Sequence, residues 1–504
     1  MNEMNNLRLY LFLYLLLISA HVAFIWSLDY IPTQDGPSHI YNLAILHDLL
    51  NGGENWGTYY EEDLRAVPNL GFQIFTYPFL SWLDPWQAEK AFLTLYVCLL
   101  ALSIPLYLIA FGCSAFPACF ITLPLAFSFP LLMGFYSYCI GIPFFFLFFS
   151  LAWITRNTKF SFIFFVHIAC GVVLFFIHLI PFVFYILSLI TISFYLLTIS
   201  RSGLFSFTKY VPSQIILLIV LVFYLSLNSS GFSFGISYIF SFDRFIYLLI
   251  DFLTFSTFDF SFYSLVMSIF FIYIFFLTLY SYYNHKYHSS TNSLYLISKP
   301  FFLVPAFLVF IYFIFPFNFG GGAYFNQRIP WVVLLLILPL MVNLNIFRAH
   351  NRIAIYIFLV IMVSLFNFID LRSNALTVAN YTKGLHIHIP ENSLILGFKQ
   401  HGMDNSRVDI LMHATAHYAL KHQAIDIGNY EAHFDYFPVQ FNKSLPPVPP
   451  LSYIEKTPDK IDLNDYPDIS YIILWNKNYK LLNNIDSHYD LLFTNDNVSI
   501  WERL

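Results

Sequence analysis

Long apolar runs recur along the first three quarters of the chain, separated by short polar segments. A membrane-spanning helix needs about 17–25 predominantly apolar residues. By this measure the pattern predicts eleven spans, at residues 9–28, 90–111, 117–134, 139–154, 160–177, 179–199, 210–227, 262–281, 300–317, 329–346 and 353–370. Residues 1–370 are therefore predicted to form a polytopic α-helical membrane domain. A twelfth span within 240–260 is the alternative, and it would invert the orientation of everything after it.

The pattern changes at about residue 371, where charged residues return and the apolar runs become short. Residues 371–504 are predicted to form a small extracytoplasmic α/β domain. The expected elements are strands at 393–398, 424–428 and 469–475, a helix at 408–421, and a hairpin formed by 489–493 and 498–502. Residues 430–438 read as a loop that folds back onto the membrane surface.

The positions of the basic residues indicate how the predicted spans are oriented across the membrane. With the N-terminus in the cytoplasm, inner segments contain Arg8, Arg156, Lys159, Arg201, Lys209, Lys286, Lys299, Arg348 and Arg352. This is the distribution of a positive-inside topology. It holds if residues 228–261 form one outer segment. The same topology places the first loop, residues 29–89, and the C-terminal domain on the outer side.

Composition agrees with this class and excludes others. The chain is 58% hydrophobic and 11% charged, which is typical of a polytopic membrane protein. Its net charge of −5 argues against a nucleic-acid partner. The five cysteines all lie in or beside apolar runs, so no disulfide framework is predicted.

The first loop carries an acidic element, Asp35-Gly36-Pro37-Ser38-His39, directly after the first apolar run. Proline suits the first turn of a helix, and the Asn51-Gly52-Gly53 stop predicts a helix over about residues 37–50. Its apolar face suits a helix lying on the bilayer surface. Asp35 and His39 can be read as a helix cap and a surface histidine. They can also be read as a catalytic or metal-binding group at the membrane–water boundary.

Three further candidates lie at the same predicted side of the membrane. Tyr136 stands in a glycine-bounded break between two spans, His178 begins a span, and Arg328 follows three glycines at 320–322. An arginine offers a fork of donors to a phosphate. The alternatives are an aromatic belt for Tyr136, a buried histidine bonded to a carbonyl for His178, and a snorkelling anchor for Arg328. Their common side favours one shared cavity.

His413 and His417 are spaced to share one helix face, which is a spacing that can bind zinc. No third ligand stands out in the sequence. The structural interpretation is therefore favoured, and no metal site is predicted there.

The arrangement resembles the GT-C superfamily of membrane glycosyltransferases. The resemblance covers residues 1–440 and rests on Asp35 to His39 after the first span, on Gly134-Phe135-Tyr136 through Gly141, and on Arg328 before a late span. It implies a sugar donor linked to polyprenyl phosphate and a glycan, lipid or protein acceptor outside the cytoplasm. It also implies a bacterial inner-membrane protein whose first-loop acid acts as general base or holds a divalent cation. Here Asp35 and His39 replace the usual pair of acids, so metal dependence stays open.

The sequence therefore predicts an integral membrane glycosyltransferase, with Asp35 as catalytic residue and His39, Tyr136, His178 and Arg328 as substrate-binding residues. Two alternatives stay open. One is a transporter or flippase of lipid-linked saccharides, although such proteins favour internal repeats that are not seen here. The other is a non-catalytic membrane scaffold of GT-C type.

Overall fold

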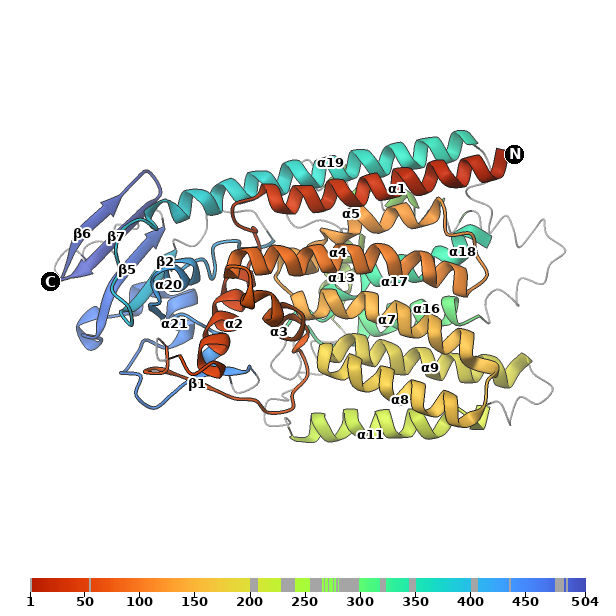
Figure 1. Cartoon of the computed structure of the whole chain (residues 1–504), viewed down its shortest axis with the longest axis horizontal. Coiled ribbons are helices and arrows are strands. Elements are labelled where there is room, and N and C mark those ends of the chain that lie inside the picture. The colour runs from red at the N-terminus through yellow and green to blue at the C-terminus, as the bar shows by residue number, and fades with distance from the viewer. Residues whose placement is uncertain are drawn as a thin grey trace.

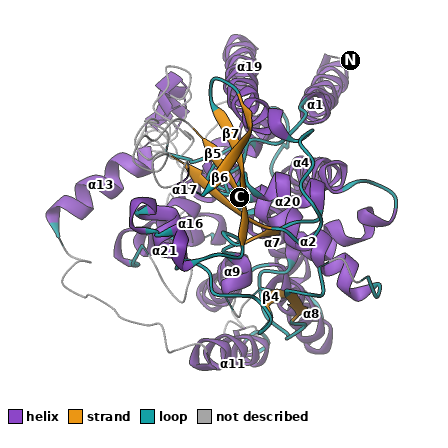
Figure 2. Ribbon diagram, turned by 90° about the vertical axis from the view of Figure 1, so that its left-hand side faces the viewer, coloured by secondary structure: helices purple, strands orange, loops and turns teal. Residues whose placement is uncertain are grey.

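The structure is a computed structural model of the whole chain. It describes residues 2–53, 56–199, 207–227, 241–253, 299–317, 323–343, 350–399, 407–434, 437–475, 485 and 488–504, and residues 265–280 with gaps at 267, 271, 275, 278 and 279. Helices run parallel to the long axis of the molecule, and a sheet lies at the end opposite the N-terminus (Figure 1). Viewed along that axis, the sheet stands in front of the helical bundle (Figure 2).

Among the described residues, six helices are long and apolar enough to cross a membrane. They lie within α1 (Asn2–Ser27), α4 (Pro85–Ala110), α7 (Tyr136–Ile154) with η3 (Thr155–Asn157), α8 (Phe160–Ile177), α9 (Leu179–Ile199) and α19 (His350–Tyr381) with η6 (Thr382–Gly384). Such helices are typical of a membrane-embedded protein. Each coincides with an apolar run in the sequence, but the predicted total of eleven spans is not confirmed.

The remaining apolar segments form shorter helices. They are η2 (Ala118–Ile121), α5 (Thr122–Ala126), α6 (Phe129–Leu132), α11 (Val211–Leu227), α13 (Phe242–Leu253), α16 (Pro300–Ile314), η5 (Asn326–Arg328), α17 (Pro330–Leu336) and α18 (Leu338–Asn343). The prediction of one continuous helix over 117–134, and of another over 329–346, was wrong. Pro124, Pro130 and Pro339 each lack the N–H that a continuous helix requires, and proline also clashes with the preceding turn. The span expected at 262–281 is described only in part, and the glycines at 320–322 lie outside the described residues.

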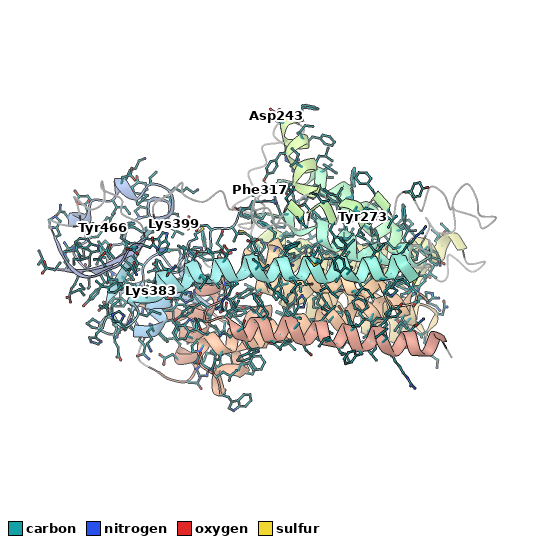
Figure 3. All side chains as sticks on the ribbon, turned by 90° about the horizontal axis from the view of Figure 1, so that it is seen from above. Asp243, Tyr273, Phe317, Lys383, Lys399 and Tyr466 are labelled. Atoms are coloured by element: carbon teal, nitrogen blue, oxygen red, sulfur yellow. The ribbon has the colours of Figure 1, made fainter. Side chains whose placement is uncertain are left out.

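The last long helix joins the two parts of the molecule. α19 continues to Tyr381, past the boundary expected at residue 370. It runs beside α1 along one edge of the bundle (Figure 1), and the His21 and Phe368 rings are 4.8 Å apart. Lys383, just beyond α19, lies at the end that also holds Lys399 and Tyr466, whereas Tyr273 lies among the bundle helices (Figure 3). The bundle therefore leads directly into the C-terminal sheet.

The first loop is packed between the bundle and the sheet. It contains α2 (Gly36–Leu50), β1 (Tyr60–Glu62), α3 (Gly71–Thr76) and η1 (Tyr77–Ser81). The expectation that the first of these helices lies on the bilayer surface was wrong. Ile40, Tyr41 and Ile45 are all fully buried, because α2 packs against α4 on one side and against the C-terminal region on the other. Two faces of α2 are thus covered by protein.

The C-terminal region holds a five-stranded sheet with the order β3-β2-β5-β7-β6. Its strands are β2 (Leu394–Lys399), β3 (Ile425–Asp426), β5 (Ile469–Trp475), β6 (Tyr489–Thr494) and β7 (Val498–Arg503). β2 pairs in parallel with β3 and β5, whereas β7 is antiparallel to β5 and β6. The predicted strands and hairpin are present. The predicted helix at 408–421 is shorter, because turns occupy 410–415 and α20 spans only Ala416–His422.

Short elements complete this region. They are η7 (Glu431–His433), β4 (Val439–Phe441), α21 (Leu451–Lys456), η8 (Pro458–Lys460) and η9 (Leu463–Asp465). β4 pairs antiparallel with β1 of the first loop, so the chain after residue 430 folds onto that loop. This pairing fixes the first loop and the C-terminal region to each other at one end of the bundle.

Candidate functional site

A cavity of about 350 Å³ lies where the bundle, the first loop and the C-terminal region meet. All five residues singled out in the sequence line it: Asp35, His39, Tyr136, His178 and Arg328. They come from the entrance and first turn of α2, from the start of α7, from the α8–α9 junction and from η5. The structure therefore brings together residues that lie up to 293 positions apart, from Asp35 to Arg328.

A close backbone approach holds Asp35 in place. The Asp35 N–H donates to the Met133 carbonyl at 3.3 Å, and the Gln34 N–H donates to the Leu132 carbonyl at 2.9 Å. Gly134 follows with a φ of +84°, and a Cβ at this position would lie 2.8 Å from the Asp35 Cβ. Only glycine adopts this conformation without strain while leaving room for the neighbouring chain. The glycine before Tyr136 thus serves to seat Asp35.

The Asp35 carboxylate is directed to the cavity and does not cap α2. No side-chain capping bond forms at the start of α2. Instead, Asp35 Oδ1 accepts a hydrogen bond from Gln34 Nε2 at 3.2 Å and lies 3.6 Å from His413 Nε2. Burial raises the pKa of Asp35 to about 6, although His39 and the Gln34 hydrogen bond oppose the rise. A carboxylate with this pKa is ionised at neutral pH and is well suited to accept a proton.

His39 pairs with a carboxylate that the sequence did not point to. Its Nδ1 lies 2.8 Å from Glu431 Oε1, and the Glu431 side chain is fully buried. Burial lowers the pKa of His39, but the Glu431 carboxylate, Asp35 and a hydrogen bond to the Gly134 backbone together outweigh burial, so the net pKa is raised. In the sequence, Glu431 is marked only by being an acidic residue within the aromatic segment 430–438. This pair links α2 to the C-terminal region beside Asp35.

His413 and His417 contact different side chains. His413 stacks on Tyr430, with ring centroids 4.5 Å apart, and burial together with His39 lowers its pKa to about 3. His417 Nδ1 accepts a hydrogen bond from the Trp86 indole N–H at 3.1 Å. Among the described residues, no three His, Cys, Asp or Glu side chains lie close enough together to hold a metal ion. The groups described around Asp35 therefore do not fit a divalent cation, and no step is assigned to one.

Arg328 presents its guanidinium to the cavity. Its Nη2 donates to the Ala323 carbonyl at 3.2 Å, and its guanidinium carbon lies 3.8 Å from the centre of the Phe135 ring. Within the part of the chain that the structure describes, its Nε has no hydrogen-bond partner and no carboxylate forms an ion pair with it. An arginine oriented by an aromatic ring and lacking a counter-ion is suited to bind an anion.

His178 faces two donors. Its Nδ1 accepts from the Ile180 N–H at 3.0 Å, while its Nε2 lies 3.1 Å from Arg328 Nη1. A neutral imidazole can accept at only one of its nitrogens. The Ile180 bond therefore competes with the Arg328 bond, and Arg328 keeps hydrogen-bonding capacity for a ligand. A purely structural histidine was expected to bond a backbone carbonyl, whereas the hydrogen bonds of His178 are with the Ile180 N–H and Arg328.

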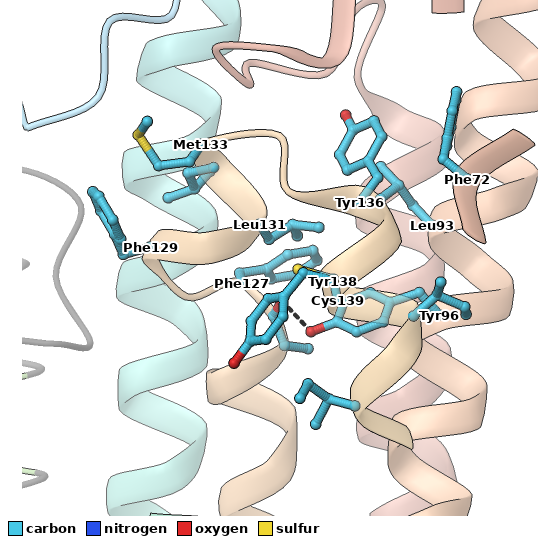
Figure 4. Close-up of a cluster of buried hydrophobic side chains, with 14 of the residues drawn as sticks. Phe72, Leu93, Tyr96, Phe127, Phe129, Leu131, Met133, Tyr136, Tyr138 and Cys139 are labelled. Atoms are coloured by element: carbon cyan, nitrogen blue, oxygen red, sulfur yellow. Dashed lines mark hydrogen bonds between the residues drawn. The ribbon is translucent and has the colours of Figure 1, made fainter. Parts of the chain in front are cut away.

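Tyr136 belongs to a buried network behind the cavity wall. Its hydroxyl donates to Glu89 Oε1 at 2.5 Å and lies 2.8 Å from Thr33 Oγ1. Its ring stands in a buried cluster with Phe72 and Leu93 (Figure 4). Glu89 is 2% exposed and was not singled out in the sequence, where it is the last residue of the predicted first loop. Tyr136 thus contributes its ring to the cavity and its hydroxyl to the support of the first loop.

Replacing Glu431 with glutamine is expected to lower stability in a pH-dependent way. His39 has a raised folded pKa, so the pair stabilises fully below the unfolded histidine pKa of about 6.5 and loses this contribution as pH rises through the folded value. We expect a loss of about 1–3 kcal/mol at about pH 6 that shrinks toward about pH 9. Thermal unfolding in detergent at several pH values measures it.

The matched control is Glu391→Gln, which changes an exposed acid in the same region. It should leave the unfolding temperature unchanged at every pH. A Glu431→Gln deficit that is the same at all pH values would show that His39 is neutral in the folded protein and that the pair is only a hydrogen bond.

The functional assignment rests on this geometry: a carboxylate, a guanidinium and two imidazoles around one cavity. No family model and no curated protein matches the chain.

Proposed function

We propose that the protein is a membrane glycosyltransferase of GT-C type that moves a sugar from a polyprenyl-phosphate donor to a hydroxyl of an acceptor. One observation carries the proposal. A carboxylate with a pKa near neutrality, Asp35, and a guanidinium without a counter-ion among the described residues, Arg328, line the same cavity at the end of an apolar helical bundle. Transfer from a lipid phosphate uses a base for the acceptor hydroxyl and a cation for the leaving phosphate, and these two groups can supply both.

In the proposed reaction Asp35 acts as general base. The acceptor hydroxyl gives its proton to the Asp35 carboxylate as its oxygen attacks the anomeric carbon of the donor. A new carbon–oxygen bond forms, and the bond between the anomeric carbon and the phosphate oxygen breaks. The polyprenyl phosphate leaves with the bonding electrons, and Arg328 stabilises the charge that develops on it. Gln34 holds the carboxylate by its hydrogen bond to Oδ1.

The lipid part of the donor has an apolar route to this cavity. Tyr224 and Leu225, near the end of α11, also line it. The adjacent Val222 and Phe223 are each 62% exposed, as expected for side chains that face lipid. A polyprenyl chain beside α11 would place its phosphate toward Arg328 while the sugar stays near Asp35.

The proposal includes a location and a sidedness. The protein is placed in a bacterial inner membrane, with a cytoplasmic N-terminus and the cavity and C-terminal region on the outer side. The distribution of basic residues supports this orientation. The packing of the first loop and the C-terminal region at one end of the bundle supports their being on the same side. The acceptor is then a glycan, lipid or protein outside the cytoplasm.

A direct test uses the purified protein in lipid vesicles with polyprenyl phosphate-linked radiolabelled hexoses and a cell-envelope extract as acceptor. We expect free polyprenyl phosphate to appear in step with a labelled product, as measured by mass spectrometry and scintillation counting. Label that crosses the bilayer while still attached to lipid would favour a flippase. Donor binding without consumption of any hexose donor would favour a scaffold. Either result would contradict the proposal.

A further inference from the structure

A second cavity, of about 200 Å³, lies inside the C-terminal region. It sits at the carboxyl ends of the three parallel strands, because Lys399, Asp426 and Trp475 line it and each is the last residue of its strand, β2, β3 and β5 respectively. The chain passes from β2 to β3 on one side and then returns to β5 on the other side of β2. Open parallel sheets bind ligands outside the carboxyl ends of their strands at such a switch point.

The lining of this cavity suits a hydroxyl-rich ligand. Asp426 is 3% exposed, and one carboxylate oxygen accepts from the Gly428 N–H at 2.9 Å. No cation pairs with Asp426 among the described residues. Burial raises the pKa of Asp426 to about 7, so near neutral pH the group can both donate and accept hydrogen bonds.

Aromatic walls and balanced charges complete the cavity. Tyr381, Phe398 and Trp475 supply apolar surface, and their rings offer faces against which the C–H face of a sugar ring can pack. Lys399 forms an ion pair with Asp409, and Lys456 stands next to Glu455. Because these cations have acidic neighbours, the cavity does not favour a phosphate or another strong anion. Acceptors, donors and aromatic rings together favour an uncharged polyol.

One layer of side chains separates the two cavities. His413 lines the second cavity, and its Nε2 lies 3.6 Å from Asp35 Oδ1 in the first. The Asp409 N–H donates to Gln34 Oε1 at 3.1 Å, while Gln34 Nε2 donates to Asp35. A ligand in the second cavity is therefore adjacent to the groups that hold the proposed base.

We propose that the second cavity binds a saccharide unit of the acceptor, one layer of side chains away from Asp35 in the first cavity. The acceptor role rests on the proposed function, whereas the saccharide site itself does not. The acceptor class is thus a glycan or a glycosylated molecule that carries an uncharged sugar near the hydroxyl to be modified.

The test is saturation-transfer NMR on the full chain in detergent micelles with maltotriose, mannotriose and chitotriose, without any lipid donor. We expect at least one trisaccharide to bind. Asp426→Asn should weaken its binding by roughly tenfold, because the amide replaces one of the two acceptor oxygens with an NH2 donor and lacks the stronger acceptor of the ionised carboxylate. Lys456→Gln, at an exposed lining position, should also weaken binding. Thermal unfolding verifies that each variant folds.

A matched variant separates the outcomes. Asp490→Asn changes an exposed aspartate on β6 that lines neither cavity, so it should keep wild-type saccharide binding. Absence of binding by all three trisaccharides, or equal binding by Asp426→Asn and wild type, would overturn the saccharide site. If saccharide binding depends on Asp426 but the protein transfers no sugar from any lipid donor, the saccharide site is supported and the proposed function is contradicted.

Discussion

Replacing Asp35 with asparagine is expected to abolish sugar transfer while the protein still folds. The amide keeps the size of the side chain and its hydrogen bond with Gln34, but it cannot accept the acceptor's proton. Loss of a general base typically costs roughly 10²–10⁴-fold in rate. Initial rates of polyprenyl phosphate release from the vesicle assay, compared with wild type at equal protein, measure the effect.

The pH profile gives an independent readout of the same residue. Burial raises the pKa of Asp35 to about 6, and the base works only when ionised. The wild-type rate should therefore fall as the pH decreases through about 6. Asp29→Asn, which changes an exposed aspartate six residues earlier, should keep both the rate and this acidic limb. Full activity in Asp35→Asn, or a profile flat from about pH 7 to about pH 5, would exclude Asp35 as the base.

Replacing Arg328 with lysine is expected to be the second most damaging change. Lysine keeps the positive charge but loses the planar fork and the stacking on Phe135, whose ring centre is 3.8 Å from the guanidinium carbon. If Arg328 stabilises the leaving phosphate, the rate constant should fall by roughly 10²–10³-fold, with a smaller rise in the donor KM. Steady-state kinetics with varied donor at saturating acceptor separates the two.

The role of Arg328 can be tested against a matched control. Arg352→Lys changes an exposed arginine near the start of α19 and should leave both constants unchanged. If Arg328→Lys had normal kinetics but a lower unfolding temperature, Arg328 would support the wall of the cavity and would not contact the phosphate. Its contacts with Ala323 and His178 would then be its whole role.

Local patterns in the sequence identified the helices and most strands. One continuous apolar run indicates a membrane span. A short apolar run between polar segments indicates a strand such as Ile469–Trp475. Turn and cap signals are also local, so the expected helix from residue 37 to residue 50 appears as α2 (Gly36–Leu50). Prolines interrupt the helices in the runs at 117–134 and 329–346, and the length and hydropathy of a run do not register this effect.

The sequence by itself also determined which side chains are candidates for the site. An ionisable group at the end of an apolar run is costly unless it has a use, and this argument selected Asp35, His178 and Arg328. It required no knowledge of which helices are neighbours. The same argument could not find Glu431, because it lies in a polar region where charged residues are common, and His413 was singled out only by its spacing to His417.

Only the tertiary structure decided how these groups are combined. His39 and Glu431 are 392 residues apart, and their contact exists because β4 pairs with β1 and α2 is enclosed between bundle and sheet. Amphipathic spacing cannot tell whether the apolar face of α2 meets lipid or protein, since both bury the same side chains. Strand order likewise depends on long-range pairing, so the cavity at the carboxyl ends of β2, β3 and β5 has no local signature in the sequence.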